Sequence, residues 1–300
     1  MSAIELHEII KNYKATRALN GLSLEVRAGE LFGLVGVNGA GKTTTLSTIM
    51  GFIRASSGTA RVLGLDPWRD APVLHANIAW LPGDVRLPDA QTALEWLKYQ
   101  ASVLKLELPR VRALASEWDL PLDRPMRTLS KGNRQKVALL RLLASDAKLL
   151  ILDEPTSGLD PVAQERLMVA LRERAQRGAT VLFSSHNLSE VQTLCDRIAV
   201  IDAGRVVREG SVSALIGQSQ TLSVWSRLEI EPSLFGDWNL ERITARHCVL
   251  EGAKLLEDAL PKLAPFGIER LEFGGMGLER LLERSHQTNL RQAQQSGGRA

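Results

Sequence analysis

The chain has 300 residues, of which 44% are hydrophobic and 24% are charged, and its formal net charge is +3. This composition is that of an ordinary globular protein and excludes a disordered or fibrous chain. The small net charge, without a dense basic run interleaved with aromatic residues, argues against a nucleic-acid partner.

No stretch approaches the ~18 consecutive apolar residues of a membrane-spanning helix, so none is expected. Residues 1–6 lack a basic segment followed by an apolar one, so no signal peptide is expected and the protein should stay in the cytosol. The two cysteines, Cys195 and Cys248, follow no metal-binding spacing, and both are expected in the core.

Residues 4–10 and 22–26 are typical of β segments joined by a polar turn, which predicts an antiparallel patch. Later apolar runs are short and continuous, as in strands that are covered on both faces, and they predict a largely parallel sheet between helices. These runs are residues 31–35, 149–152, 180–183 and 198–201. Between about residues 87 and 143, apolar positions at helical spacing predict a helical insert, with helices over 93–104, 109–118 and 132–143.

After residue 217 the pattern changes to extended segments over 222–230, 247–250 and 268–273, with helices over 254–263 and 278–282. We therefore expect a main domain over 1–217, a small α+β domain over 218–284 and a flexible tail over 285–300.

The sequence from Gly36 to Thr43 is the most informative feature of the chain. It reads Gly36-Val37-Asn38-Gly39-Ala40-Gly41-Lys42-Thr43, it follows the apolar run 31–35, and it precedes a segment compatible with a helix. Glycines let the backbone N–H groups and the helix N-terminus surround phosphate oxygens, while the lysine reaches the outer phosphates and the threonine offers Mg²⁺ a hydroxyl. The pattern predicts an ATP-binding phosphate loop, which we extend to Thr44.

A pair of acids, Asp153 and Glu154, ends the apolar run 149–152. In open parallel sheets the carboxyl ends of the strands form the ligand edge. We expect Asp153 to hold Mg²⁺ and Glu154 to orient and deprotonate the water that attacks the terminal phosphate.

A third motif, Leu129-Ser130-Lys131-Gly132-Asn133-Arg134-Gln135, stands just before a helix, with Ser130 placed as its N-cap. A serine hydroxyl, a glycine backbone and a helix N-terminus together make a second anion site. With the phosphate loop and the acidic strand in this order, residues 4–210 closely resemble the ATP-binding subunit of an ABC transporter. The resemblance implies an α/β fold: a P-loop NTPase core with a mixed sheet, an antiparallel β patch and a helical insert, plus a small C-terminal α+β domain.

The resemblance also assigns roles to single residues. Tyr13 would stack on adenine, Ser157 and Asp160 would form the D-loop that contacts the opposite subunit, and His186 would touch the γ-phosphate. Asp160-Pro161 is in addition typical of an N-cap and a first helical residue.

Two departures from the family pattern stand out. The signature usually reads Leu-Ser-Gly-Gly-Gln, whereas here Lys131 and Asn133 replace its third and fifth residues and leave Ser130 and Gly132 in place. The family also has a glutamine at or near Gly83, which has no side chain to approach Mg²⁺ and the attacking water. Asp84 either takes over as an oxygen ligand or is a turn residue.

In this family the signature of one subunit completes the site of the other, so the resemblance implies a homodimer that holds two ATP molecules, with Mg²⁺, at its interface. It further implies a separate polytopic permease subunit that docks on the helical insert, a peripheral location on the cytoplasmic side of the membrane, and export, by likeness of the C-terminal domain to that of drug, antibiotic and ABC-2 exporters. Trp96 and Trp118 of the insert are either partner anchors or core residues, and we favour the core. The alternatives are a soluble ABC-type ATPase without a role in transport and a P-loop kinase, which would have no use for the signature.

Overall fold

The computed structural model describes residues 1–14, 16–216, 220–231, 239–251 and 255–275. The chain divides into two compact units, Met1–Arg208 and Glu209–Ala300. Each unit has its own hydrophobic core.

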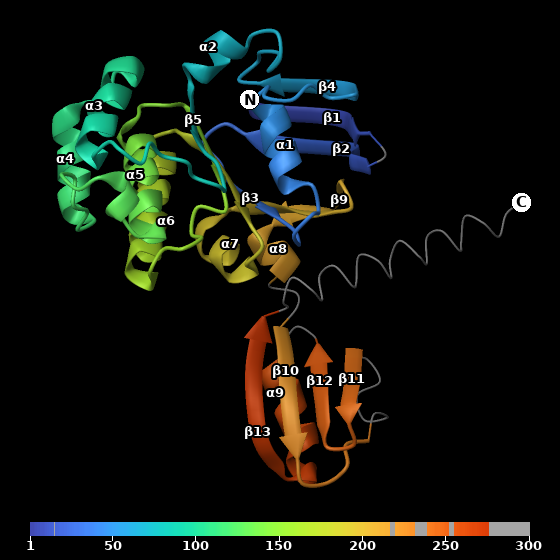
Figure 1. Cartoon of the computed structure of the whole chain (residues 1–300). Coiled ribbons are helices and arrows are strands. Elements are labelled where there is room, and N and C mark those ends of the chain that lie inside the picture. Colours follow the sequence, from blue (N-terminus) through green and yellow to red (C-terminus); the bar gives the residue numbers. More distant parts are fainter. Residues whose placement is uncertain (15, 217–219, 232–238, 252–254, 276–300) are drawn as a thin grey trace, which may run out of the picture. The chain divides into compact units, whose positions relative to one another are not determined.

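A mostly parallel sheet forms the centre of the first unit (Figure 1). Within the described residues its strand order is β5-β6-β7-β3-β8-β9, and each neighbouring pair from β5 to β8 is parallel. The strands are β5 (Ile78–Leu81), β6 (Leu149–Asp153), β7 (Thr180–Ser185), β3 (Leu31–Val35), β8 (Arg197–Asp202) and β9 (Arg205–Ser211). Because β3, β6 and β7 are buried along their whole length, the parallel sheet predicted from the continuous apolar runs is confirmed.

The antiparallel patch is also confirmed, and it is larger than predicted. In the described ranges, β1 (Ser2–Tyr13) pairs with β2 (Thr16–Arg27) on one side and with β4 (Ser57–Val62) on the other. The helix α1 (Lys42–Ile49) contributes Leu46 and Ile49 to a core that contains residues of both sheets. The start of α1 is thereby fixed against the carboxyl end of β3.

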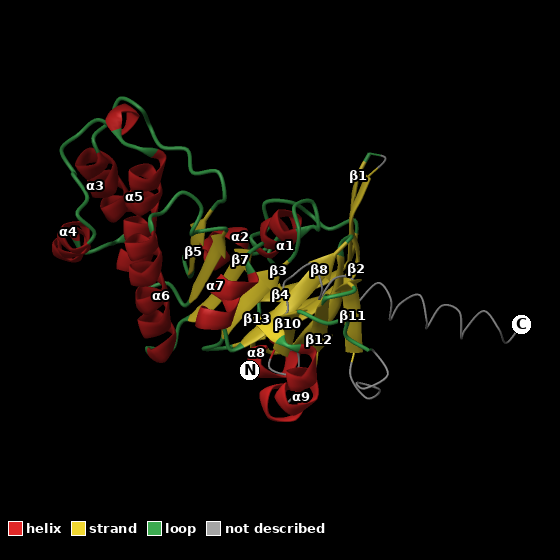
Figure 2. Ribbon diagram, turned by 90° about the horizontal axis from the view of Figure 1, so that it is seen from below, coloured by secondary structure: helices red, strands yellow, loops and turns green. Residues whose placement is uncertain are grey.

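The helical insert predicted over 87–143 consists of α3 (Ala93–Leu104), α4 (Leu108–Glu117), the short η1 (Met126–Thr128) and α5 (Lys131–Ala144). These helices lie together beside β5, as Figures 1 and 2 show. Thr92 and Glu95 form a capping box that fixes the start of α3. Trp118 is fully buried, which confirms the core interpretation for this residue, and Trp96 is half-buried. The other helices in the described part of this unit are α2 (Ala71–His75), α6 (Pro161–Gln176) and α7 (Leu188–Leu194).

In its described residues, the second unit begins with the end of β9 and the short α8 (Val212–Ile216), and it contains a small antiparallel sheet and the helix α9 (Leu255–Leu263). The described strands of this sheet run in the order β11-β12-β10-β13, and α9 contributes Ala259 and Leu263 to the core. On β10, β12 and β13, the ring of Trp225 stacks on His247 at 4.2 Å, and the Arg270 guanidinium lies over the Trp225 ring at 4.9 Å. The strands are β10 (Gln220–Ser226), β11 (Asn239–Thr244), β12 (His247–Glu251) and β13 (Ile268–Gly275), and η3 (Ala264–Phe266) precedes the last.

The prediction of an extended segment over 222–230 is wrong beyond Ser226, where β10 ends. The Ser226 hydroxyl donates to the carbonyl of Leu228 at 2.7 Å, which turns the chain out of the strand. The helix predicted over 278–282 and the tail predicted over 285–300 lie outside the described residues.

Both cysteines are buried, as predicted. Burial raises the pKa of the Cys248 thiol to about 11 and that of Cys195 further still. Neither thiol is activated as a nucleophile or a metal ligand, because activation requires a lowered pKa.

The turn after α1 requires a glycine at position 51. Its φ is +68°, and a Cβ added there would lie 1.9 Å from the carbonyl oxygen of Pro67. We expect Gly51→Ala to lower the free energy of unfolding by about 3 kcal/mol or more, since a backbone clash adds to the strain of a left-handed conformation. Urea unfolding measures the change.

Gly29 is the matched control, because its φ of +77° is similar and a Cβ there would meet nothing within 4 Å. Gly29→Ala should therefore cost only the left-handed strain, about 1 kcal/mol. Equal losses in the two variants would refute the clash at Gly51.

Candidate ATP site

The phosphate loop lies between the end of β3 and the start of α1, as its sequence predicts. Lys42 is 6% exposed, and its Nζ donates to the carbonyl oxygens of Gly36 at 2.7 Å and Val37 at 3.3 Å. Val37 and the next two residues, Asn38 and Gly39, are exposed. The loop thus folds around its own lysine and leaves its tip open to solvent. The predicted binding residues Gly36, Val37, Asn38, Gly39, Ala40, Gly41, Lys42, Thr43 and Thr44 all lie in this loop or in the first turn of α1.

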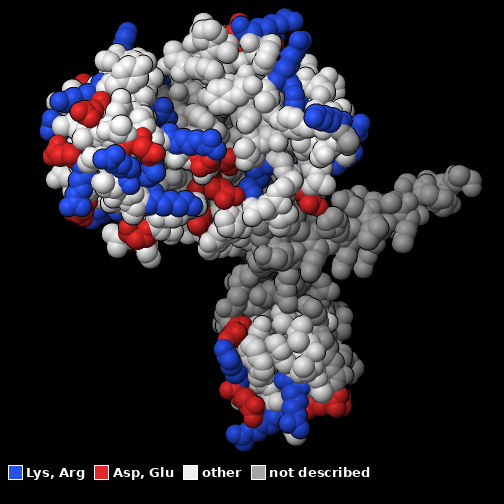
Figure 3. Space-filling model, viewed as in Figure 1, with Lys and Arg blue, Asp and Glu red and all other residues white. Residues whose placement is uncertain are grey.

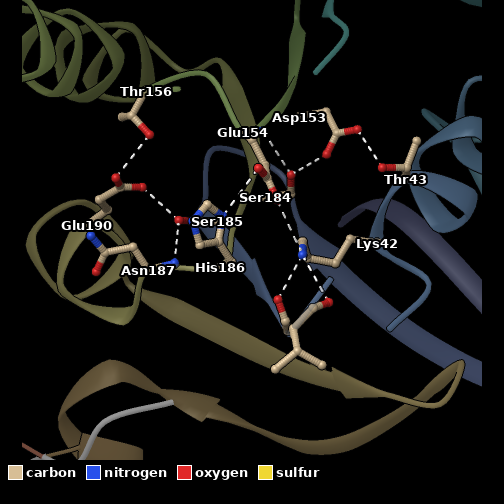
Figure 4. A network of polar contacts seen from close by, with 12 residues as sticks. Lys42, Thr43, Asp153, Glu154, Thr156, Ser184, Ser185, His186, Asn187 and Glu190 are labelled. Carbon is tan, nitrogen blue, oxygen red and sulfur yellow. Dashed lines mark hydrogen bonds and ion pairs between the residues drawn. The ribbon is translucent and has the colours of Figure 1, made fainter. Parts of the chain in front are cut away.

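Asp153, at the end of β6, is held by two hydroxyl groups. Thr43 Oγ1 donates to its Oδ2 at 2.8 Å, and Ser184 Oγ donates to its Oδ1 at 2.6 Å. The carboxylate is 3% exposed. The structure therefore brings Thr43 and Asp153, both predicted as metal ligands, into direct contact (Figure 4).

Glu154 leaves the strand in a left-handed conformation, with a φ of +46°. Its backbone N–H donates to Ser184 Oγ at 3.0 Å, and this bond holds the turn. Oε1 of its carboxylate lies 3.4 Å from Lys42 Nζ, and Oε2 lies 3.2 Å from His186 Nδ1. The side chain is 27% exposed, so the predicted catalytic pair, Glu154 and His186, is assembled beside the phosphate-loop lysine.

A second polar network lies next to this pair, and sequence reasoning missed it. Glu190 of α7 accepts from Thr156 Oγ1 at 3.0 Å and from Ser185 Oγ at 2.6 Å. Ser185 Oγ also accepts from the N–H of Asn187 at 2.9 Å. The network joins the segment after Glu154 to the segment that carries His186, and all of these residues are shown in Figure 4.

The signature residues begin α5, and Ser130 is its N-cap, as predicted: its hydroxyl accepts from the N–H of Asn133 at 3.2 Å. Gly132 lies against the backbone of Gly158, because an added Cβ would be 2.6 Å from the Gly158 carbonyl oxygen. The aliphatic part of Lys131 lies alongside Gly158 as well. In the described part of the chain, no hydrogen bond joins residues 130–133 to the phosphate loop.

Asp160 caps α6, as predicted, by accepting from the N–H of Ala163 at 2.9 Å. Its other oxygen lies 3.2 Å from Lys136 Nζ. The backbone hydrogen bond, helped by Lys136, lowers the pKa of the Asp160 carboxyl. Ser157 lies in the tight turn after Glu154, where its N–H donates to the Glu154 carbonyl at 3.1 Å.

Gly83 lies beside the candidate metal ligands, whereas Asp84 does not contact them. A Cβ added at Gly83 would be 3.4 Å from Asp153 Oδ2. The Asp84 carboxylate is 76% exposed and pairs with Arg86 Nε at 2.9 Å.

Tyr13 lies at the end of β1 and is 44% exposed, with Lys11 Nζ 5.1 Å from its ring centroid. It pairs in register with Thr16 at the start of β2. Further along β2, the carbonyl of Ala18 lies close to Gly41 of the phosphate loop. The ring thus belongs to the hairpin that approaches the loop, and it does not take part in the polar contacts of the site.

Comparison with known proteins identifies the family. The ABC transporter family profile matches residues 19–157. The Nod factor export ATP-binding protein I of Paraburkholderia xenovorans is 36% identical over 221 residues, which cover 72% of this chain and 73% of the relative. The chain belongs to the ABC transporter ATP-binding proteins. It is thus an ATP-binding subunit and an ATPase, and subunits of this kind assemble with membrane subunits and as dimers.

Two further similarities agree with this family. The daunorubicin/doxorubicin resistance ATP-binding protein DrrA of Streptomyces peucetius is 36% identical over 219 residues, covering 71% of this chain and 66% of that protein. A solved structure of an ATP-binding subunit of an ABC transporter superposes with a TM-score of 0.67 at 29% identity, covering 71% of this chain and 91% of the other. None of the helices in the described ranges has both the length and the hydrophobicity needed to span a bilayer.

Ser184 is the residue on which both acids depend, since its hydroxyl donates to Asp153 and accepts from the N–H of Glu154. We expect Ser184→Ala to lower the free energy of unfolding by about 1–3 kcal/mol, because it leaves a buried carboxylate oxygen and a buried N–H with fewer partners. Chemical denaturation checks the value.

Ser189→Ala is the control: its hydroxyl donates to Asn187 at 2.7 Å on the exposed surface, and the cost should stay within about 0.5 kcal/mol. A Ser184 variant as stable as the Ser189 variant would contradict a structural role of this bond.

Proposed function

We propose that the chain energises export through a separate polytopic membrane subunit, and that two copies of the chain pair around two ATP molecules. The printed names of the relatives above, Nod factor export and daunorubicin/doxorubicin resistance, favour export over import. The subunit would then be peripheral to the membrane, on its cytoplasmic side.

The proposed pairing of two copies of the chain rests on one observation. The start of α5, with exposed Ser130 and Lys131, presents N–H groups of a 14-residue helix, yet it rests on Gly158 of its own chain and not on its own phosphate loop. A helix N-terminus attracts anions, and its first N–H groups lack partners within the helix. A second copy of the chain would place Ser130, Lys131, Gly132 and Asn133 against the phosphates held by the first, while Ser157 and Asp160 would lie at the same interface.

The residues of one copy suit the rest of the nucleotide. Lys42 would neutralise the outer phosphates, the N–H groups of the phosphate loop would bind their oxygens, and Tyr13 would stack on adenine. The touching oxygens of Thr43 and Asp153 are of the hard type that Mg²⁺ prefers, so this pair fits the ion. For Asp84 to add a further oxygen, its carboxylate must leave Arg86. Bound Mg²⁺ would offset phosphate charge.

Glu154 is placed to act as the general base. Its carboxylate lies between the cation of Lys42 and the ring of His186, so it is oriented before ATP arrives. It would accept a proton from the attacking water, while His186 Nδ1, through its contact with Oε2, keeps the carboxylate in position and its imidazole reaches the γ-phosphate.

The experiment that tests this function is Glu154→Gln. We expect the rate of ATP hydrolysis to fall by roughly 100-fold to 10,000-fold, the usual contribution of a general base. Because ATP persists, the variant should form a stable dimer with magnesium and ATP, which light scattering would detect.

Lys42→Ala is the comparison: it should weaken ATP binding itself and form no dimer, since the phosphate charge then lacks its main counter-charge. Normal ATP hydrolysis by the Glu154→Gln variant would show that Glu154 is not the general base. If that variant stayed monomeric at saturating ATP, the proposed site between two copies would be wrong.

We further propose that the membrane subunit docks where the helical insert meets the core. A groove of about 410 Å³ lies there, between the turn after α1, the strand β5 and the ends of α3 and α5. Phe52, which is 51% exposed, packs edge-on against Trp80 at 6.1 Å and near His75 at 5.5 Å. Large exposed aromatic residues in a groove suit the apolar face of a partner helix.

A photoreactive phenylalanine analogue at Phe52 tests this docking site. In membranes of the native cells we expect it to crosslink to a polytopic membrane protein. The same analogue at Val169, which is 53% exposed on α6, should give no such product. Crosslinks from Phe52 to soluble proteins alone would contradict the proposal.

A further inference from the structure

A second cavity of the first unit has no part in the ATP site. It measures about 630 Å³, lies beside β4 and the segment that follows it, and is lined by Arg54, Arg61, Trp68 and Arg69 among others. Figure 3 shows Lys and Arg side chains on the surface where Figure 1 shows β4 and the loop between β4 and α2, with few acidic side chains among them.

The positive charge of this cavity is weakly compensated. Among the described residues, no carboxylate lies within 4.0 Å of the guanidinium of Arg54 or Arg61, and Arg69 has only Asp66, at 4.0 Å. Asp66 also lines the cavity and offsets part of this charge: its Oδ1 accepts from the backbone N–H groups of Trp68 at 2.9 Å and Arg69 at 3.0 Å, and its Oδ2 faces Arg69. Glu5 stands opposite Arg61 in the β1–β4 pairing, but these two described side chains form no ion pair within 4.0 Å.

A further cation lies at the same place. Lys11 Nζ donates to the backbone carbonyl of Arg54 at 2.8 Å, so the hydrogen bond does not neutralise its charge. Hydroxyl groups of Ser57 and Thr59 also line the cavity. The cavity lining thus carries three arginines against one acid, Asp66, and such an excess of cationic donors is the chemistry that binds a phosphate group.

Exposed apolar side chains adjoin the arginines. Trp68 is 49% exposed and Val73, on α2, is 60% exposed. Pro67 and Trp68 lie against Gly51, because a Cβ there would be 3.4 Å from the Trp68 nitrogen. This contact brings the exposed Phe52, next to Gly51, to the same part of the surface. Tryptophan with arginine on one surface is typical of proteins that lie at the interface of a membrane, where the ring is half in apolar surroundings and the cations meet anionic headgroups.

We propose that this cavity binds the phosphate of anionic phospholipids, and that Trp68 enters the interfacial layer of the bilayer beside it. The site goes beyond the ATPase and beyond docking to a membrane subunit. It is nevertheless consistent with docking, because the turn over residues 50–54 contributes Met50 and Phe52 to the docking groove and Arg54 to this cavity. A surface that faces the membrane subunit on one side of this turn would meet lipid on the other.

The chemistry favours a lipid phosphate over the other phosphates in a cell. A soluble phosphate compound gains nothing from exposed Trp68 and Val73, and nucleic acid requires a longer basic track than one cavity provides. Phospholipid headgroups present phosphate next to an apolar layer, which matches both halves of the surface.

The test is sedimentation of the full chain with vesicles. We expect binding to vesicles of equal parts phosphatidylglycerol and phosphatidylcholine, weakening as salt is added, and little binding to phosphatidylcholine alone. The triple variant Arg54→Gln, Arg61→Gln and Arg69→Gln should lower the partition coefficient by roughly 100-fold, at about fivefold for each arginine near an anionic surface. Trp68→Ala should lower it by roughly fivefold.

The matched control removes the same charge from elsewhere in the first unit. Arg112, Arg124 and Arg127 are exposed residues of the helical insert, and changing all three to glutamine should alter the partition coefficient less than twofold if bulk charge is not the cause. Thermal unfolding midpoints of both triple variants check that the fold is retained. Because this assay contains neither ATP nor a membrane subunit, its failure would leave the proposed function standing.

Several results would overturn the lipid site. Equal binding to both kinds of vesicle, or an equal loss in the two triple variants, would do so. Calorimetric binding of sn-glycerol 3-phosphate as tight as vesicle binding would assign the cavity to a soluble phosphate. The cavity would be assigned to nucleic acid if a DNA oligonucleotide bound the wild-type chain and the control triple variant but not the variant of Arg54, Arg61 and Arg69.

Discussion

The structure of the site depends on how two neighbouring carboxylates are accommodated at the end of one buried strand. Asp153 and Glu154 follow four apolar residues of β6, where an acid without partners would be costly. The left-handed turn at Glu154 sends the two side chains in different directions, one to Thr43 and Ser184 and the other to Lys42 and His186. Each acid thereby ties the end of β6 both to the start of α1 and to the end of β7, and the strand ends of β3, β6 and β7 are held as one edge.

Much of this edge could be predicted from the sequence. Phosphate loops, acidic strand ends and N-caps are local patterns, since their chemistry requires particular residues at fixed spacing. Gly36 to Thr44, Asp153 and Ser130 could therefore be placed on a strand end or a helix start without knowledge of the fold. The parallel order of the buried strands follows from the same continuous apolarity.

What the sequence could not provide is pairing over long distances. Ser184 and Glu190 are ordinary residues in sequence, and they become part of the site only because β7 lies beside β6 and α7 follows it. The strand β4 escaped prediction for a related reason, since its burial pattern is mostly exposed and it is held by its register with β1. The cavity beside β4 has no sequence motif either, because Arg54, Arg61 and Arg69 meet through the turn at Gly51 and the β1–β4 pairing. The end of β10 was mispredicted because one serine hydroxyl, and not a glycine or a proline, turns the chain.

One side-chain contact of α5 has a mechanical consequence. Gln135, one turn into that helix, donates its amide to the carbonyl of Pro155 at 3.1 Å, in a buried position directly after Glu154. The same helix packs against α3 and α4. A tilt of α3, α4 and α5 as one body would therefore shift the backbone at Pro155, next to Glu154, through this hydrogen bond. A displacement that begins at α3 or α4 would thus be transmitted along the backbone to the Glu154 carboxylate, which lies between Lys42 and His186.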